Sequence, residues 1–225
     1  MSLSELWSLY GQNYIDALLA TWGMTLESFA IAMVLAVAVT VMRVSPLKPL
    51  RVFGDLYVQV FRNIPGIALL IIVVYALPPL KVVLPYRTCV IVATVLLGSA
   101  FGSENFMSGI NTVGVGQVEA ARSLGMSFSR ILAKIVIPQA LRSSVLPMTN
   151  LFIAVMLTTA LGSQVPLKPQ ELTGVVSYIN TRSLGGVAAF FISALGYLGT
   201  AFVVSHIGNY IDKLSLIHIS EPTRH

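Results

Sequence analysis

The sequence predicts an all-α membrane protein with about five transmembrane helices, and three observations support this prediction. Hydrophobic residues make up 56% of the 225 residues, charged residues make up 10%, and the mean hydropathy is +0.82. A soluble domain usually carries close to one quarter charged residues. Several apolar runs reach the roughly 20 residues that a helix needs to cross the hydrocarbon core of a bilayer. Between two of these runs lies a charged segment that has the periodicity of a helix.

Five apolar runs are long enough to span a membrane. In chain order they cover about 21–42, 54–80, 88–110, 145–165 and 183–205. Asn63-Ile64-Pro65-Gly66 interrupts the second run early. Gly98 and Gly102 in the third run form a GxxxG pattern, which lets helix backbones approach closely. We interpret this pattern as packing within one bundle, and a dimer contact is the alternative.

The distribution of Lys and Arg predicts the orientation of the spans, because cytoplasmic loops carry the excess of both residues. Most of the basic residues follow the first, third and fifth spans: Arg43, Lys48, Arg51, Arg62, Arg122, Arg130, Lys134, Arg142 and Lys213. The other loops contain only Lys81, Arg87, Lys168 and Arg182. We therefore expect an external N-terminus and a cytoplasmic C-terminus. The first residues lack a basic region, so we expect the first span, rather than a cleaved signal peptide, to direct insertion.

The sequence contains no pattern typical of a catalytic, cofactor or metal site. It has no GxxxxGK[ST], no HExxH and no GxSxG, and Cys89 is its only cysteine. The formal charge of +5 is scattered rather than gathered in a block that would bind nucleic acid. We expect a protein that is not an enzyme. If it moves a solute uphill, another subunit must supply the energy.

The charged segment at 117–138 has an apolar stripe whose members recur at spacings of four, three and four: Leu124, Phe128, Ile131 and Ile135. Gly125 indicates a turn or a close contact, and Pro138 is expected to end the segment. The pattern predicts a short helix, a bend, a second helix and a new entry into the membrane. Periodicity alone favours a different interpretation, an amphipathic loop that lies on lipid headgroups.

The order Glu119-Ala120-Ala121, Gly125 and Ile135-Val136-Ile137-Pro138 resembles the EAA loop of ATP-binding cassette (ABC) importer permeases. The family pattern is EAA-x3-G-x9-I-x-L-P, and Ile137 stands where Leu is usual. The stretches "FRNIPG", "SGINTVGVGQVEAARSLGMS" and "IPQALRSSVLPMTN" resemble the permeases for polar amino acids, and glutamate-type permeases most of all. The resemblance extends over most of the chain.

This resemblance implies a permease transmembrane domain over 1–214, with a coupling loop at about 117–138 between the third and fourth spans. Its ATPase-coupling residues would be Glu119, Ala120, Ala121, Gly125 and Pro138. It also implies that the chain lies in the bacterial inner membrane and has three kinds of partner: an ATPase dimer that binds ATP and Mg²⁺, a second permease subunit, and an extracytoplasmic substrate-binding protein. No cofactor is expected in this chain itself.

The sequence departs from the family at positions where related permeases often carry charge. Glu104 matches a glutamate of the third span, but Met107 stands where Arg is frequent. Leu157 and Thr158 occupy a usual Lys and Asp or Asn, so we expect a heterodimer whose other permease supplies these groups. The candidates for the translocation path are Glu104, Asn150, Thr158 and Thr159. For Glu104 we favour the alternative interpretation, a structural carboxylate that fixes the third span.

Two other functions remain open from the residues alone: a passive channel or gated pore, and a membrane scaffold without transport. The EAA spacing favours the transporter over both. The last residues, "SLIHISEPTRH" from 215 to 225, do not continue the family pattern. We interpret this tail as translated sequencing-adapter sequence and leave it out of the fold prediction.

Overall fold

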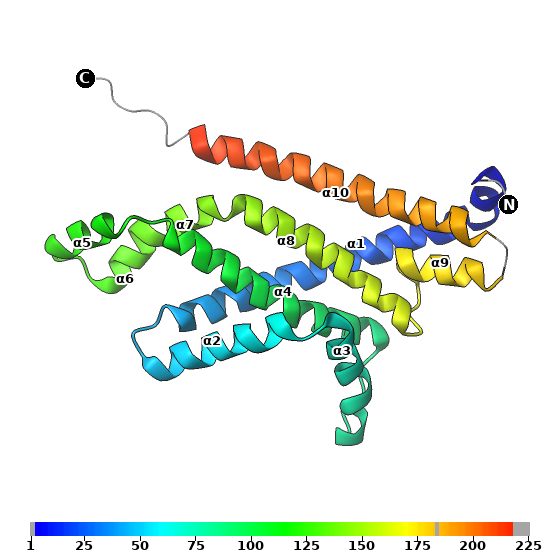
Figure 1. Cartoon of the computed structure of the whole chain (residues 1–225), viewed down its shortest axis with the longest axis horizontal. Coiled ribbons are helices and arrows are strands. Elements are labelled where there is room, and N and C mark those ends of the chain that lie inside the picture. Colours follow the sequence, from blue (N-terminus) through cyan, green and yellow to red (C-terminus); the bar gives the residue numbers. More distant parts are fainter. Residues whose placement is uncertain (1–2, 183–184, 218–225) are drawn as a thin grey trace.

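The computed structural model describes residues 3–182 and 185–217, with side chains up to 214, and the regular secondary structure of this part is helical. Four helical segments are long and apolar enough to cross a membrane, and they run along the long axis of the molecule (Figure 1). They are α1 (Leu3–Arg43), α4 (Tyr86–Asn111), α8 (Val145–Thr158) continued by the 3₁₀ helix η4 (Thr159–Gln164), and α10 (Gly186–Ile217). The all-α membrane fold is confirmed.

The predicted second span is a bent pair of helices. Helix α2 (Lys48–Asn63) and the helical run from α3 (Gly66–Ile71) to Leu80 meet at an angle of 103°. Pro65 stands at this break, where its ring and missing N–H oppose a continuous helix. Figure 1 shows α2 alongside the bundle and α3 projecting away from it. The chain therefore has five spans if this pair counts as one, and the interruption predicted at Asn63-Ile64-Pro65-Gly66 is confirmed as a sharp bend.

Helix α1 is much longer than the predicted first span. It begins at Leu3 rather than near residue 21. Its first half buries Leu6, Tyr14 and Ala17 against the short helix α9 (Leu172–Asn180) and the start of α10. This apolar face is hard to recognise in the sequence, because polar residues from the other faces of the helix stand between its members. Helix α10 likewise continues past residue 205, and residues 218–225 of the doubtful tail lie outside the described part.

Small residues bring α1 and α4 close together. A Cβ atom on Gly98 would lie 3.2 Å from Cβ of Ala32, and one on Gly102 would lie 2.9 Å from Cβ of Ala36. Both glycines are therefore needed for the close approach of these two helices. The GxxxG pattern packs helices within the bundle, as expected.

Candidate functional site

A helical loop connects α4 to α8 beyond one end of the bundle (Figure 1). It contains α5 (Val115–Ser123), α6 (Phe128–Ile131), a π-helical turn η3 (Leu132–Val136) and α7 (Ile137–Ser143). The predicted order of helix, bend, helix and re-entry is confirmed.

Gly125 forms the bend through a left-handed backbone conformation, with φ of +75°. Its N–H donates to the carbonyl of Arg122 at 2.9 Å, and the N–H of Met126 donates to the carbonyl of Ala121 at 3.1 Å. This pair of bonds is the Schellman motif, in which a glycine at the left-handed position closes the end of a helix. No atom lies within 4 Å of a Cβ placed on Gly125, so the turn rather than a close contact requires glycine.

The loop has an apolar core of its own, and this core divides the predicted stripe. Ile131 is buried and Ile135 is half-buried, whereas Leu124 is 82% exposed and Phe128 is 49% exposed. The expectation of one continuous apolar face is wrong, because the bend at Gly125 separates Leu124 from α6, and on α6 itself Ile131 packs inward while Phe128 stays exposed. Leu124 and Phe128 therefore remain on the outer surface of the loop.

The residues of the EAA pattern separate into surface and core. Glu119 and Ala120 are exposed, but Ala121 is 3% exposed and packs in the core of the loop. The side chain of Ala121 thus supports the loop and cannot itself contact a docked partner. Pro138 does not end the segment, since it lies in the first turn of α7. The π-helical turn before it changes the hydrogen-bond register, which accommodates a proline that would clash in a regular α-helix.

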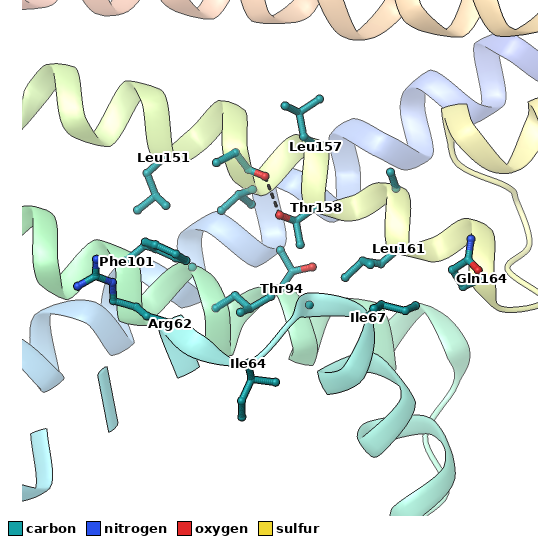
Figure 2. Close-up of a pocket in the computed structure, with 16 residues that line it drawn as sticks. Arg62, Ile64, Ile67, Thr94, Phe101, Leu151, Leu157, Thr158, Leu161 and Gln164 are labelled. Carbon is teal, nitrogen blue, oxygen red and sulfur yellow. Dashed lines mark hydrogen bonds between the residues drawn. The ribbon is translucent and has the colours of Figure 1, made fainter. Parts of the chain in front are cut away.

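A pocket of about 650 Å³ lies between α4, the α8–η4 segment and the break that separates α2 from α3. Most of its lining is apolar, and the polar side chains in it are Arg62, Thr94, Thr158 and Gln164. Figure 2 shows Arg62 with Phe101 at one end and Gln164 at the other, with Thr94 and Thr158 between them.

Of the four candidates for the translocation path, Thr158 lines this pocket. Its Oγ1 donates to the carbonyl of Ala154 at 2.7 Å. Thr159 is buried and its Oγ1 donates to the carbonyl of Met156 at 2.6 Å. Asn150 is exposed, and neither it, Thr159 nor Glu104 belongs to the described lining of the pocket. The structure therefore does not bring the four candidates together at one site.

Glu104 belongs instead to a cluster of ion pairs that joins three helices. Its Oε2 lies 3.2 Å from Nη1 of Arg43 and 3.3 Å from Nη1 of Arg62. Nε of Arg43 also donates to Asp55 at 2.9 Å. The cluster ties the end of α1 to α2 and α4, which supports the structural interpretation of Glu104.

Arg62 is a residue of the pocket that the sequence argument counted only as a loop charge. It lies in the last turn of α2 just before the break, and its guanidinium lies 5.3 Å from the ring centroid of Phe101. The motif "FRNIPG" drew attention to this part of the sequence, but it did not indicate that the side chain of Arg62 lines a pocket. The pocket forms beside the point where the chain bends by 103°, at Pro65.

Glu171 is a second residue that the sequence argument missed. Its side chain is completely buried and caps α9, where Oε2 accepts from the N–H of Thr173 and Oε1 from that of Gly174, each at 2.6 Å. The hydroxyl of Tyr197 on α10 also donates to Oε2, at 2.9 Å. Burial raises the pKa of Glu171, and these donors only partly oppose that rise. A glutamate directly before an apolar helical pattern was the available signal.

Comparison with known proteins places these features in context. Residues 28–215 match the model of a family described as "Binding-protein-dependent transport system inner membrane component". The glutamate transport system permease protein GluC of Corynebacterium efficiens is 33% identical, over 87% of this chain and 91% of that protein. The L-cystine transport system permease protein TcyB of Bacillus subtilis is 31% identical, over 92% of this chain and 90% of that protein.

Solved structures agree on the fold. A crystal structure of an amino acid ABC transporter with histidines has a chain that superimposes with a TM-score of 0.88 at 24% identity. The alignment covers 95% of this chain and 98% of that one. An inward-facing structure of the MetNI methionine ABC transporter gives a TM-score of 0.70 at 19% identity, over 96% of this chain and 99% of the other.

Proposed function

The chain belongs to the family of binding-protein-dependent transport system inner membrane components, and we propose that it is the permease subunit of an ATP-driven importer of polar amino acids. The observation that carries the proposal is the loop between α4 and α8. There the EAA spacing coincides with an exposed helix, closed by a glycine turn, at one end of the bundle. The relatives named for glutamate and cystine transport support an amino acid as the cargo.

In this proposal ATP and Mg²⁺ are bound by an ATPase dimer rather than by this chain, and the loop receives the motion of that dimer when it closes. Glu119, Ala120 and the exposed Leu124 and Phe128 offer the docking surface. An extracytoplasmic binding protein delivers the amino acid from outside a bacterial inner membrane, where the N-terminus lies.

Contacts of α4 with the end of the loop and the start of α8 give this motion a route into the bundle. Nδ2 of Asn105 donates to the carbonyl of Pro147 at 3.1 Å, and Oγ of Ser144 donates to the carbonyl of Asn105 at 3.4 Å. A Cβ on Gly109 would lie 2.6 Å from the carbonyl oxygen of Ala140, so α4 and α7 touch through their backbones. Glu104, one residue before Asn105, then links α4 to Arg62 in the pocket.

Transport by a reconstituted complex tests the proposal. Liposomes that contain this chain, its ATPase and its second permease should accumulate labelled glutamate, glutamine or cystine when the loaded binding protein and internal ATP are present. Uptake that proceeds equally without ATP would instead favour a passive pore. A complex that transports none of these amino acids under any condition would favour a scaffold.

The proposed orientation predicts the labelling of single cysteines. With Cys89→Ala as the background, Ser127→Cys in the loop should be protected from an impermeant thiol reagent in intact cells, and Thr181→Cys after α9 should react. Both positions are exposed, so accessibility of the side chain does not limit the reaction. Permeabilised cells provide the control, in which both cysteines should react. Labelling of Ser127→Cys alone in intact cells would reverse the orientation.

The departures at Met107 and Leu157 lead us to propose a heterodimer. The α8 wall of the pocket presents Leu157 and the hydroxyl of Thr158, with no charged group among its described residues. A charged cargo in an apolar pocket needs partners, because an unpaired buried charge is costly. This chain with only the ATPase and binding protein should therefore import little, and adding a second permease that has Lys and Asp or Asn at the matching positions should restore uptake. Full transport by two copies of this chain would refute the heterodimer.

A further inference from the structure

A narrow groove lies at the end of the bundle where α1 passes into α2, and it shares no lining residue with the pocket described above (Figure 1). The last turns of α1 and α4 and the η3–α7 segment of the loop form its walls, which enclose about 100 Å³. Thr40 is the one polar residue of the described lining. Its hydroxyl donates to the carbonyl of Ala36 at 2.7 Å and lies 3.0 Å from that of Ser103. The groove therefore suits a hydrocarbon chain rather than a polar solute.

The π-helical turn η3 builds the loop wall of this groove. Leu132 and Ile137 both line it, and they are five residues apart. In a regular α-helix, residues five apart point about 140° away from each other. The wider π turn, whose hydrogen bonds join residues five apart, brings these two side chains onto one face, and Leu141 continues that face along α7. The local change of helix type thus gives the loop an apolar surface that turns toward α1.

The rim of the groove is apolar and open to the surroundings of the bundle. Val37 and Val41 on α1 are 49% and 56% exposed, and Ile137 and Leu141 on α7 are 41% and 52% exposed. Along α1 the groove reaches from Val37 to Val44, or about 10 Å, up to the end of this helix. In the proposed orientation this end lies at the cytoplasmic surface of the membrane. An acyl chain of the inner leaflet can therefore enter the groove from the side.

The loop segment beside the groove carries positive charge and no negative charge. Residues 128–143 include Arg130, Lys134 and Arg142, all of them exposed, but neither Asp nor Glu. None of the three forms an ion pair with another described residue. Glu104, the one carboxylate of α4, already belongs to the cluster of ion pairs described above. The cations of the loop therefore remain available to an anionic group, such as those that the lipids of a cytoplasmic leaflet present.

We propose that this groove binds an acidic phospholipid: the groove holds one acyl chain, and Lys134 and Arg142 bind the phosphate of the headgroup. These two cations are chosen because Lys134 lies between Leu132 and Ile137 in the sequence and Arg142 directly follows Leu141. A narrow groove beside unpaired cations fits a single chain attached to an anionic headgroup better than it fits the apolar face of another helix. The bound lipid would join the loop to α1 at the membrane surface.

Lipid binding to the complete complex in detergent tests the headgroup. The complex is titrated with dioleoyl-phosphatidylglycerol or dioleoyl-phosphatidylcholine, and native mass spectrometry measures the affinity of the tightest binding step. The wild type should prefer the anionic lipid. Replacing both cations, with Lys134→Gln and Arg142→Gln, should weaken phosphatidylglycerol binding by about 25-fold, or about fivefold for each charge, and leave phosphatidylcholine binding unchanged. Arg122→Gln is the matched control, since it removes an exposed arginine of the same loop from α5, outside the groove.

A second pair of variants tests the groove itself. Val41→Phe fills the groove from its rim and should weaken binding of both lipids by about tenfold. Val34→Phe places the same ring two turns earlier on the same face of α1, at a 74% exposed position outside the groove, and should change neither affinity. Because Val41 is half exposed, Val41→Phe without added lipid should melt close to the wild type. Added phosphatidylglycerol should then raise the melting temperature of the wild type more than that of Val41→Phe.

Each other outcome has a defined consequence. Equal affinities for the two lipids in the wild type would overturn the role of the cations. Unchanged lipid affinities in Val41→Phe would overturn the groove as the binding site. If the chain alone binds phosphatidylglycerol but the complete complex does not, another subunit covers the groove and the inference fails. If the double variant of Lys134 and Arg142 keeps its lipid affinity but no longer co-purifies with the ATPase, these cations serve the ATPase instead. Because binding is measured without transport, the expected lipid affinities would support the site even in a complex that imports no amino acid.

Discussion

Replacing Gly125 by valine is expected to abolish the stimulation of ATP hydrolysis by the loaded binding protein, while the chain still enters the membrane. Gly125 has a φ of +75°, and a residue with a Cβ pays about 1–2 kcal/mol in this left-handed conformation, with β-branched residues at the unfavourable extreme. The small loop core offers little burial to offset this cost, so the turn should open. The hydrogen bond from Met126 to Ala121 and the position of Glu119 would then be lost together.

Two variants of the same loop control this prediction. Gly125→Asn should keep most of the stimulation, because asparagine tolerates the left-handed region better than other residues. Gly116→Ala should be neutral, since Gly116 lies inside α5, has no atom near its Cβ position and carries no positive φ. Stimulated ATP hydrolysis in proteoliposomes is the measurement, and co-purification of the ATPase reports whether docking itself is lost. Normal stimulation in Gly125→Val would remove the turn from the coupling step.

The sequence predicted those parts of the fold that depend on local chemistry. Hydropathy located the long helices, "NIPG" located the break after Asn63, and the spacing from Glu119 to Gly125 located the helix and turn of the loop. Each of these signals is complete within one short stretch of chain. Boundaries were less accurate where a helix continues through polar residues, as in the first turns of α1.

The pocket could not be predicted in this way, because its walls come from segments far apart in the chain. Arg62 approaches Phe101 and Glu104 only after the chain bends at Pro65 and α2 packs beside α4. Thr94 reads in the sequence as one more small residue of an apolar span. Its hydroxyl has no hydrogen-bond partner among the described residues, and this is a property of the packing around it. The prediction of one apolar face across Gly125 was wrong for a related reason. The turn there ends one helix and a second begins after it, whereas the periodicity assumes a single continuous helix.

The buried carboxylate of Glu171 gives the second large expected effect, on stability. Glu171→Ala should lower the free energy of unfolding by about 4 kcal/mol, because it leaves two backbone N–H groups and the hydroxyl of Tyr197 without their acceptor in a buried site. The loss should also loosen α9 from its neighbours. The backbone of Leu172 there accepts from Ser193 on α10 at 2.7 Å and donates to Thr21 on α1 at 3.2 Å.

Thermal melting of the purified chain in detergent measures this effect, and a fall of the midpoint by roughly 10 °C is expected for a chain of this size. Glu27→Ala is the matched control. Glu27 pairs with Arg87 at 2.7 Å, but both side chains are about half exposed, and exposed ion pairs add little to stability. The control should therefore melt close to the wild type. If the two variants lost similar amounts of stability, the cap at Glu171 would contribute no more than a surface charge, and α9 would have to be held by its other contacts with α1 and α10.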